Sequence, residues 1–402
     1  MTNHHSQSNN AGSPQQSDSS DKNPKKRVGF VGCGWVAQQV WLPILGSYPN
    51  VELVVIVDPS QDIQQKMRQQ FPNIACFDTT DGLKSMEALD LVFISSPNVF
   101  HYPQAKQVLE LGINVVIEKP ACFYGWQLNE LINTAQTNEV RLWVSSASVN
   151  RPDVQKMLSL ATQEQIGNIT SVSARWIRGK GIPNPGSWFT DKKMAIAGAG
   201  ADLGWHLADV ALLFFSDFQI DKHICQTSDL ETVDESIAAG WKTDMDVKTK
   251  SQPNNIDVEV KSYCCIQTKN QQLMHLEAAW ISHEKYDHTQ IIVEGTNGVL
   301  QLDTTFGFST NTLNEPSLIL KKRGQVTHYD VPEFHKMAPY EHFIAEVMSS
   351  FESDDSSEYR HYLATTEIME AIFGEEVYED YPETLLQIDM TSLQDMCETV
   401  TV

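Results

Sequence analysis

Short apolar runs alternate with amphipathic segments in the first third of the chain. The apolar runs predict strands, and the segments between them carry apolar residues at the three- and four-residue spacing of helices. The predicted strands cover residues 27–32, 51–58, 89–97, 114–120 and 140–148, and the predicted helices cover 35–47, 61–71, 102–112 and 124–139. Pro43 should end or bend the first helix, because its ring clashes with the preceding turn. Strands that alternate with helices predict a doubly wound parallel sheet.

The pattern changes after residue 150, where hairpins replace this alternation. A helical pattern at 153–167 precedes longer strand candidates joined by turn residues such as Lys269-Asn270, Asn297-Gly298 and Gly324. The candidates cover residues 169–179, 258–268, 272–282, 289–295, 299–303, 317–323 and 325–331. Because hairpins join antiparallel strands, this part should be α+β with an open, mostly antiparallel sheet. Helical patterns return after residue 351.

Composition narrows the possible partners and compartments. The chain has 52 acidic and 29 basic residues, and a formal net charge of −23 should repel nucleic acid and anionic membranes. Its seven cysteines are irregularly spaced, which indicates neither a disulfide framework nor a zinc ribbon and favours the cytoplasm. No apolar run approaches the roughly 18 residues of a membrane span, and the N-terminus lacks the apolar region of a signal peptide.

A glycine motif follows the first predicted strand. Gly32, Gly34 and Ala37 form G-x-G-x-x-A between a strand and a helix, which is the setting in which such a loop binds a dinucleotide pyrophosphate. Asp58 ends the second strand, 24 residues after Gly34, where a carboxylate can bind ribose hydroxyls. The next three residues are Pro, Ser and Gln, so no basic side chain follows that could bind a 2′-phosphate. NAD is therefore favoured over NADP. The alternative is a glycine-rich turn without a ligand.

Three further motifs complete a family pattern. "SSPNVFH" at 95–101, "EKP" at 118–120 and "DLGWHLAD" at 202–209, together with "GCGWVA", resemble the glucose–fructose oxidoreductase / inositol dehydrogenase (Gfo/Idh/MocA) family over roughly residues 27–374. One departure stands before the last motif, where "AIAGAGAD" interleaves alanines with the glycines common in that family. The glycine loop and the resemblance together predict cofactor contacts from Gly32, Gly34, Trp35, Val36, Ala37, Asp58, Ser96, Pro97, Asn98, His101, Glu118 and Lys119.

The resemblance also implies the catalytic residues. Lys119 stands at the carboxyl end of a strand, where parallel sheets bind ligands, and its ammonium could hold a substrate oxygen. His206 would be the general base, since histidine has a pKa near working pH, and Asp202 would orient it or bind substrate. On a helix these two residues and Asp209 share one face, with Asp209 as a supporting residue. Arg151 matches a position near the substrate in the family.

Other interpretations of these residues stay open. Lys119 could be merely solvated. Asp202 could be a helix cap beside a hydrogen-bonded histidine, or Asp202, His206 and Asp209 could bind a metal, although we predict no metal site. Trp188 could stack on a sugar ring or anchor its loop. The predicted substrate-binding residues are Lys119, Arg151, Trp188, Asp202 and His206.

These observations predict four segments and one activity. Residues 1–26 form a disordered tail without apolar residues to bury, 27–150 a Rossmann dinucleotide-binding domain, 151–385 a substrate-binding and oligomerisation domain, and 386–402 a polar tail. The expected protein is a homo-oligomeric, dimeric or tetrameric, NAD-dependent oxidoreductase. It should act on a hydroxyl- or keto-bearing carbon of a sugar, sugar derivative or cyclitol. The alternatives are an NAD-dependent glycoside hydrolase and a non-catalytic dinucleotide sensor.

Overall fold

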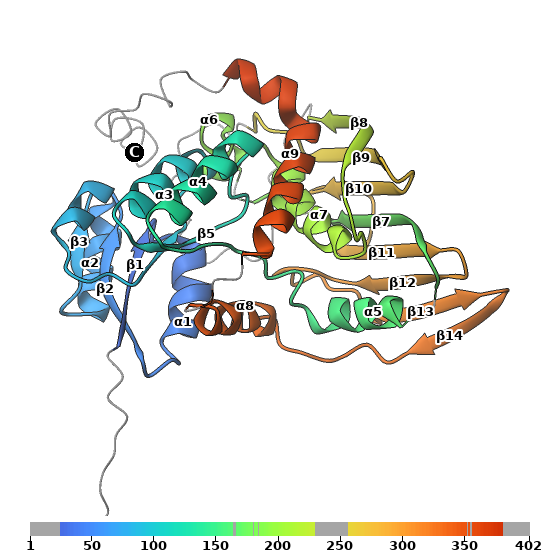
Figure 1. The fold of residues 1–402 in the computed structure, drawn as a ribbon, viewed down its shortest axis with the longest axis horizontal. Coiled ribbons are helices and arrows are strands. Elements are labelled where there is room, and N and C mark those ends of the chain that lie inside the picture. Colours follow the sequence, from blue (N-terminus) through green and yellow to red (C-terminus); the bar gives the residue numbers. More distant parts are fainter. Residues whose placement is uncertain are drawn as a thin grey trace, which may run out of the picture.

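Two β-sheets occupy opposite ends of the molecule in the computed structural model, with helices between them (Figure 1). The structure describes residues 25–163, 166–179, 181–183, 185–229, 256–351, 353 and 356–380, without the side chains of 375–380. The predicted C-terminal tail lies outside these ranges, as does the predicted N-terminal tail up to residue 24. No helix in the described ranges combines the length and the apolar character needed to cross a membrane.

The first sheet has six strands and is wholly parallel, which confirms the predicted parallel pairing. Its strand order is β3-β2-β1-β4-β5-β6. The strands are β1 (Lys26–Val31), β2 (Val51–Val57), β3 (Ala75–Phe77), β4 (Leu91–Ile94), β5 (Asn114–Ile117) and β6 (Leu142–Val144). All five predicted strands are present. The sequence analysis missed β3, because three residues at a sheet edge carry too little periodicity.

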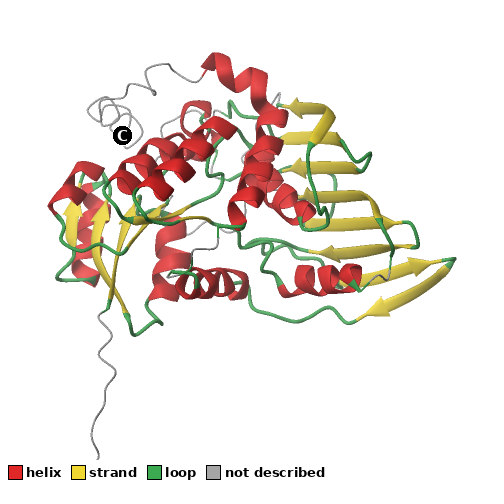
Figure 2. Ribbon diagram, in the orientation of Figure 1, coloured by secondary structure: helices red, strands yellow, loops and turns green. Residues whose placement is uncertain are grey.

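Helices cover both faces of this sheet, which confirms the doubly wound architecture (Figure 2). One face packs on α3 (His101–Glu110) and α4 (Gly125–Thr137), and the other on α2 (Gln61–Gln70), the helix after β1 and α8 (Ala338–Ser349). Successive residues of β4 alternate between these two cores. Short 3₁₀ turns lie at η2 (Thr80–Ser85) and η3 (Asn98–Phe100).

The first helix continues through Pro43 instead of ending there. A π-helical turn, η1 (Ala37–Trp41), directly precedes α1 (Leu42–Leu45), and the amide of Leu42 donates to the carbonyl of Ala37. A wider turn gives the proline ring room and absorbs its missing N–H. The helix therefore ends two residues after Pro43, at Leu45, and a π-helical turn precedes the proline.

The second sheet has eight strands in the order β14-β13-β12-β11-β7-β10-β9-β8. The strands are β7 (Ile169–Ile177), β8 (Ile220–Ser228), β9 (Lys261–Thr268), β10 (Leu273–Ala279), β11 (His288–Gly295), β12 (Gly298–Thr304), β13 (Ser317–Lys322) and β14 (Gln325–Tyr329). The three predicted hairpins are present, and among these strands β7 and β10 form the single parallel pair. The sequence analysis missed β8, whose polar, exposed edge strand lacks an apolar alternation.

The remaining helical elements lie between residues 152 and 380 of the chain. They are α5 (Pro152–Thr162), the 3₁₀ turn η4 (Trp188–Thr190), α6 (Lys192–Ala195), the π-helical turn η5 (Gly200–Gly204), α7 (Trp205–Leu212) and α9 (Glu358–Asp380). Helix α7 contacts β7 and β10, and α9 contacts α7, β8 and also α4 of the first half. A helix from the end of the chain therefore ties both halves together.

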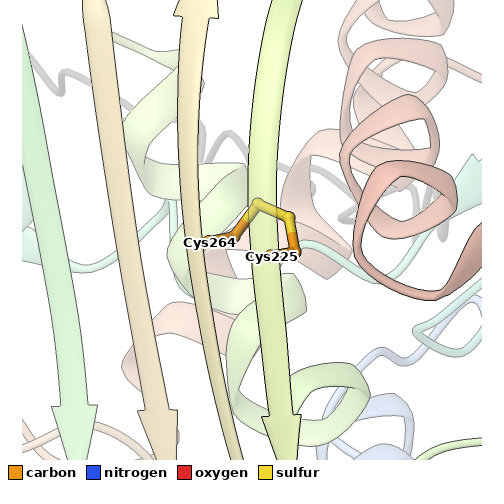
Figure 3. Close-up of a disulfide and its surroundings, with 2 residues drawn as sticks. All are labelled: Cys225 and Cys264. Carbon is orange, nitrogen blue, oxygen red and sulfur yellow. A yellow bond between two sulfur atoms is a disulfide. The ribbon is translucent and has the colours of Figure 1, made fainter.

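One disulfide departs from the sequence analysis. Cys225 on β8 and Cys264 on β9 are paired opposite each other in the antiparallel ladder, 39 residues apart (Figure 3). Linear spacing cannot indicate this pairing, because only the strand register makes the two residues neighbours. Cys33, Cys76, Cys122 and Cys265 are free, and Cys397 lies outside the described residues.

A buried ion pair fixes α9 against α7. His361 Nε2 lies 2.6 Å from Asp209 Oδ1, and the hydroxyl of Ser146 donates to the other oxygen of the same carboxylate. Burial alone would lower the pKa of His361, but the Asp209 carboxylate outweighs burial, and the net pKa is raised. Asp209 is 1% exposed, so its side chain serves this helix contact rather than the pocket described below.

This pair should make stability depend on pH. A histidine whose pKa is raised by folding stabilises the folded state fully below its unfolded pKa of about 6.5, and this contribution is lost as pH rises through the folded pKa. We expect His361→Gln to lose stability relative to the natural protein at pH 6 and to lose less at pH 9. Urea unfolding at both pH values measures the difference, and an equal loss at both would contradict the assignment.

Candidate active site

An ion pair joins the two halves at the carboxyl end of β5. Lys119 follows this strand by two residues, and its Nζ lies 2.9 Å from Asp202 Oδ1 and 3.1 Å from the Asp202 carbonyl. Both side chains are largely buried, with 15% and 13% of their surface exposed. The peptide bond between Lys119 and Pro120 is cis. The structure thus brings together the "EKP" and "DLGWHLAD" segments, which the sequence analysis expected to meet.

His101 connects the two loops that end β4 and β5. Its Nδ1 lies 2.8 Å from the Pro120 carbonyl and its Nε2 lies 2.9 Å from the Ser96 carbonyl. Burial lowers the pKa of His101 to about 4, so the ring is neutral and donates to one of the two carbonyls. Asn98 donates from Nδ2 to the Ala195 carbonyl, 2.8 Å away in α6. These two predicted cofactor residues therefore also hold the loops and the two halves in place.

Glu118 is held by Trp41, which lies in the core that packs on α2 and α8. Its Oε1 accepts from Trp41 Nε1 at 2.8 Å, and its Oε2 accepts from the Lys119 amide at 3.1 Å. Trp41 is the last residue of the π-helical turn and is fully buried in the core. Burial raises the pKa of Glu118. The strand end that carries Lys119 is therefore fixed by a side chain from the helix after the glycine loop.

The glycine loop fits a bound pyrophosphate. Gly32 has φ of +77°, and a Cβ there would lie 2.5 Å from the Ser96 amide, so the turn requires glycine. A Cβ at Gly34 would meet no atom within 4 Å, which leaves open space beside the start of the helix. Asp58 is buried, and its two oxygens accept from the amides of Cys33 and Ser60 at 2.8 and 2.9 Å. A carboxylate retains lone pairs beyond these two bonds for ribose hydroxyls.

The other predicted cofactor residues surround this loop. Trp35, Val36 and Ala37 begin the helix after β1, and Ser96 and Pro97 follow β4. The Trp35 ring lies 5.3 Å from the ring of Phe308, which belongs to the second half. The loop is therefore covered on one side by an aromatic contact between the halves.

His206 lies beside a pocket of about 590 Å³. Its Nδ1 is 2.9 Å from Ser148 Oγ, and both residues line the pocket. Burial, followed by the nearby Lys119, lowers the pKa of His206 to about 3. This differs from the ordinary histidine pKa that the sequence analysis assumed, because burial and the cations Lys119, Arg178 and Arg151 disfavour the charged ring. The imidazole is neutral, as a general base must be before it accepts a proton.

The pocket walls come from several segments that are far apart in the chain. The lining residues are Ala147, Ser148, Arg151, Asp153, Trp176, His206, Thr304, Thr305, Gly307, Thr312, Leu313, Pro316, Val331, Pro332, Glu333, Phe334, Lys336, Pro339 and Tyr340. Arg151 pairs with both oxygens of Asp153 at 2.7 and 3.0 Å. Trp188 is not in this lining and packs on Phe189, with ring centres 4.2 Å apart.

Two family models match the chain. Residues 26–146 match the oxidoreductase family with an NAD-binding Rossmann fold, and residues 154–301 match the GFO/IDH/MocA C-terminal domain. The chain belongs to the GFO/IDH/MocA oxidoreductase family. This confirms the family predicted from the four motifs.

Two similar proteins are named as oxidoreductases of sugar derivatives. A putative UDP-kanosamine synthase oxidoreductase subunit of Amycolatopsis mediterranei is 32% identical over 76% of this chain and 83% of that protein. The D-glucoside 3-dehydrogenase of Escherichia coli K12 is 29% identical over 46% of this chain and 53% of that protein.

Solved structures of low sequence identity share the GFO/IDH/MocA fold seen here. GenD2 from gentamicin A biosynthesis, in complex with NAD, has a TM-score of 0.68 at 20% identity and covers 87% of this chain and 94% of its own. KijD10, a 3-ketoreductase from Actinomadura kijaniata with NADP and TDP-benzene, has a TM-score of 0.68 at 18% identity and covers 88% and 98%.

Several residues of this GFO/IDH/MocA site escaped the sequence analysis. Ser148 contacts His206, whereas Arg178 and Trp280 contact Asp202. No motif singles them out, since each simply follows a strand of ordinary composition. The described residues contain no group of three or more His, Cys, Asp or Glu side chains placed to hold a metal ion.

Glu259 secures the start of the helix that carries Asp202 and His206. Its carboxylate accepts from the amides of Gly198 at 2.7 Å and Gly200 at 2.9 Å, and its carbonyl accepts from Ala199 at 3.0 Å. Burial raises the pKa of Glu259 to about 7. The alanine-rich "AIAGAGAD" variant of the family segment therefore keeps glycine at two positions that approach Glu259 directly.

Gly198 offers a test of this anchoring. A Cβ at Gly198 would lie 2.0 Å from the Glu259 carbonyl oxygen, so Gly198→Ala must displace backbone. We expect a loss of about 1–3 kcal/mol in the free energy of unfolding, the usual range for overpacking. The control is Gly374→Ala in α9, where the nearest atom is 3.8 Å away and no loss is expected. Urea unfolding compares both variants, and equal stabilities would contradict the close approach.

Proposed function

We propose that the protein is an NAD-dependent oxidoreductase that transfers a hydride between the nicotinamide and a hydroxyl- or keto-bearing carbon of a sugar, sugar derivative or cyclitol. One observation carries the proposal. Lys119, which closes the nucleotide-binding half, meets Asp202 in the segment that also carries His206, and His206 lines a pocket of about 590 Å³. Pockets of roughly 300–1,000 Å³ hold small organic ligands, and a sugar with a substituent is of that kind.

The polar groups at the site suit alcohol oxidation and ketone reduction. A bound nicotinamide supplies or accepts the hydride. Lys119 holds the reacting oxygen and stabilises the negative charge that grows on it. When Nδ1 of His206 carries its proton, Ser148 Oγ accepts it at 2.9 Å, and Nε2 is left to take the hydroxyl proton. Asp202 keeps the Lys119 ammonium in place at 2.9 Å.

The names of the relatives support a sugar as substrate. A UDP-kanosamine synthase subunit and a D-glucoside 3-dehydrogenase are both oxidoreductases of sugar derivatives. The pocket suits such a molecule, because it combines hydroxyl-bearing side chains such as Thr304 and Thr305 with the rings of Trp176, Phe334 and Tyr340.

NAD is the proposed nucleotide. The solved neighbours include complexes with NAD and with NADP, so the fold accepts either. Asp58 is buried at the end of β2 and keeps its carboxylate toward the loop of Gly32 and Gly34. A 2′-phosphate at that position would face a like charge.

Turnover with a panel of polyols, sugars, glycosides and nucleotide sugars tests the activity. We expect reduced nicotinamide to form with NAD in preference to NADP. Lys119→Ala and His206→Ala should lower kcat/KM by about 10²–10⁴-fold, the range of a lost acid–base or charge-stabilising group. The control Lys106→Ala removes a surface lysine that pairs with Glu130, and it should retain activity.

Three outcomes would contradict the proposal. Full turnover by Lys119→Ala or His206→Ala would remove the assigned chemistry. Hydrolysis of a glycoside without net formation of reduced nicotinamide would favour the glycoside hydrolase. Tight NAD binding without turnover of any panel member would favour the sensor.

We also propose that the protein is a homo-oligomer. Ile224, Tyr263 and Leu273 are exposed apolar residues on β8, β9 and β10, with 80%, 39% and 39% of their surface accessible. Ile224 stands opposite Cys265 and Leu273 opposite Gln267, which places all three on the outward face of the sheet. An exposed apolar patch of this kind favours association.

Light scattering measures the mass of the assembly. We expect a dimer or tetramer, and Ile224→Glu should shift it toward the monomer, because the substitution puts a charge into the patch. The surface control is Lys84→Glu at a distant exposed site, which should leave the mass unchanged. A natural protein that is monomeric at micromolar concentration would contradict this proposal.

A further inference from the structure

Two hydrogen-bond donors reach the candidate active site from β7 and β10, the one parallel pair among the described strands of the second sheet. In the register of β7 and β10, Ile177 stands beside Ala279. Each strand ends at that residue, so the next residues, Arg178 and Trp280, leave the sheet side by side. An antiparallel pair would have sent them to opposite edges. The parallel pairing therefore brings a guanidinium and an indole to the same place.

Both side chains converge on Asp202 Oδ2, while Lys119 contacts the other carboxylate oxygen. Trp280 Nε1 donates to Asp202 Oδ2 at 3.0 Å, and Arg178 Nη2 lies 3.7 Å from the same oxygen. The other oxygen, Oδ1, accepts from Lys119 Nζ at 2.9 Å. The carboxylate is thus divided, with one oxygen toward the sheet and one toward the lysine of the nucleotide-binding half.

The two donors are themselves fixed. Trp280 is fully buried, and its amide donates to the Val260 carbonyl at 3.0 Å. The Arg178 amide donates to Ala279 at 2.9 Å, and Nη1 donates to the Gly181 carbonyl at 3.0 Å. A carboxylate held by pre-positioned donors loses little freedom when it binds a third group.

We propose that Arg178 and Trp280 are positioning residues, which fix Asp202 so that its Oδ1 holds the Lys119 ammonium at the reacting oxygen. This inference rests on the proposed function of Lys119. The indole N–H of Trp280 and the guanidinium of Arg178 both meet Asp202 Oδ2, so these residues act through Asp202. Burial alone would raise the pKa of Asp202, but Lys119 and Arg178 outweigh it and lower that pKa, so the carboxylate stays charged at working pH.

Kinetics separate positioning from a merely structural contribution. We expect Trp280→Phe and Arg178→Gln to lower kcat by about 10- to 100-fold, the effect of losing a hydrogen bond or ion contact to a charged group. KM should change by less than about threefold, because the pocket is untouched. Arg178→Lys should recover part of the loss, since it keeps the charge but not the forked geometry.

Matched controls exist in the same chain. Arg175 on β7 pairs with Glu277 and Glu284 on the outward side, so Arg175→Gln removes an arginine from the same strand without touching Asp202. Trp205 is fully buried, and its indole N–H has no hydrogen-bond partner among the described residues, so Trp205→Phe removes the same volume without a hydrogen bond. Both controls should keep kcat within about threefold when compared at equal folded fraction.

A second measurement does not need turnover. Acetylation of Lys119 in the cofactor-free protein, followed by mass spectrometry, reports how firmly Asp202 holds the ammonium. Trp280→Phe should raise the acetylation rate of Lys119 at least threefold, while Lys106 on the surface reacts as before and Trp205→Phe leaves both rates unchanged.

The two measurements distinguish the inference from the proposed function. If no panel sugar is turned over but Trp280→Phe raises the reactivity of Lys119, the positioning holds and the proposed function fails. If sugars are turned over and neither kcat nor Lys119 reactivity differs from the matched controls, the proposed function stands and the positioning is wrong.

Discussion

The buried ion pair between Lys119 and Asp202 is the contact on which the site depends. Two charges are removed from water, and such a pair is stable only when further hydrogen bonds satisfy the remaining atoms. Here the Asp202 carbonyl also accepts from Lys119 at 3.1 Å, and Trp280 satisfies the second carboxylate oxygen at 3.0 Å. A single isolated pair at this depth would cost more than it returns. The surrounding donors explain why both sheets must be completed before the site exists.

More positive than negative side chains act on His206, and the excess lowers its pKa. Lys119, Arg178 and Arg151 all lower the pKa of His206, whereas Asp202 raises it, and burial adds the largest lowering effect. The imidazole is therefore a weak base in the ligand-free protein. In the reaction proposed above, a substrate oxygen that loses its proton beside Lys119 would add negative charge, which would favour the imidazolium. On this view the basicity of His206 develops together with the reaction instead of being present beforehand.

The sequence predicted the scaffold better than the electrostatics. Apolar runs and the 3.6-residue helical period located the long strands and helices of the first half, because buried strands such as 114–117 are apolar on both faces. Short or polar edge strands, β3 and β8, gave no such signal. The ring of contacts around Asp202 was also hidden, since Arg178 and Trp280 are neighbours only through a register that hydrophobic patterning does not specify. The same holds for Cys225 and Cys264.

The two π-helical turns show how local irregularity aims the functional side chains. One, Ala37–Trp41, precedes Pro43 and points Trp41 to Glu118, while the other, Gly200–Gly204, contains Asp202. An extra residue per turn rotates the side chains before it relative to those after it. Asp202, His206 and Asp209 would share one stripe on a regular helix, yet Asp202 faces Lys119 and Asp209 faces His361. Gly200 begins the second turn and approaches Phe373 and Ser262 too closely for any Cβ, so the packing of this turn requires glycine there. A regular α-helix here would leave either the lysine or the helix contact of α9 without its carboxylate.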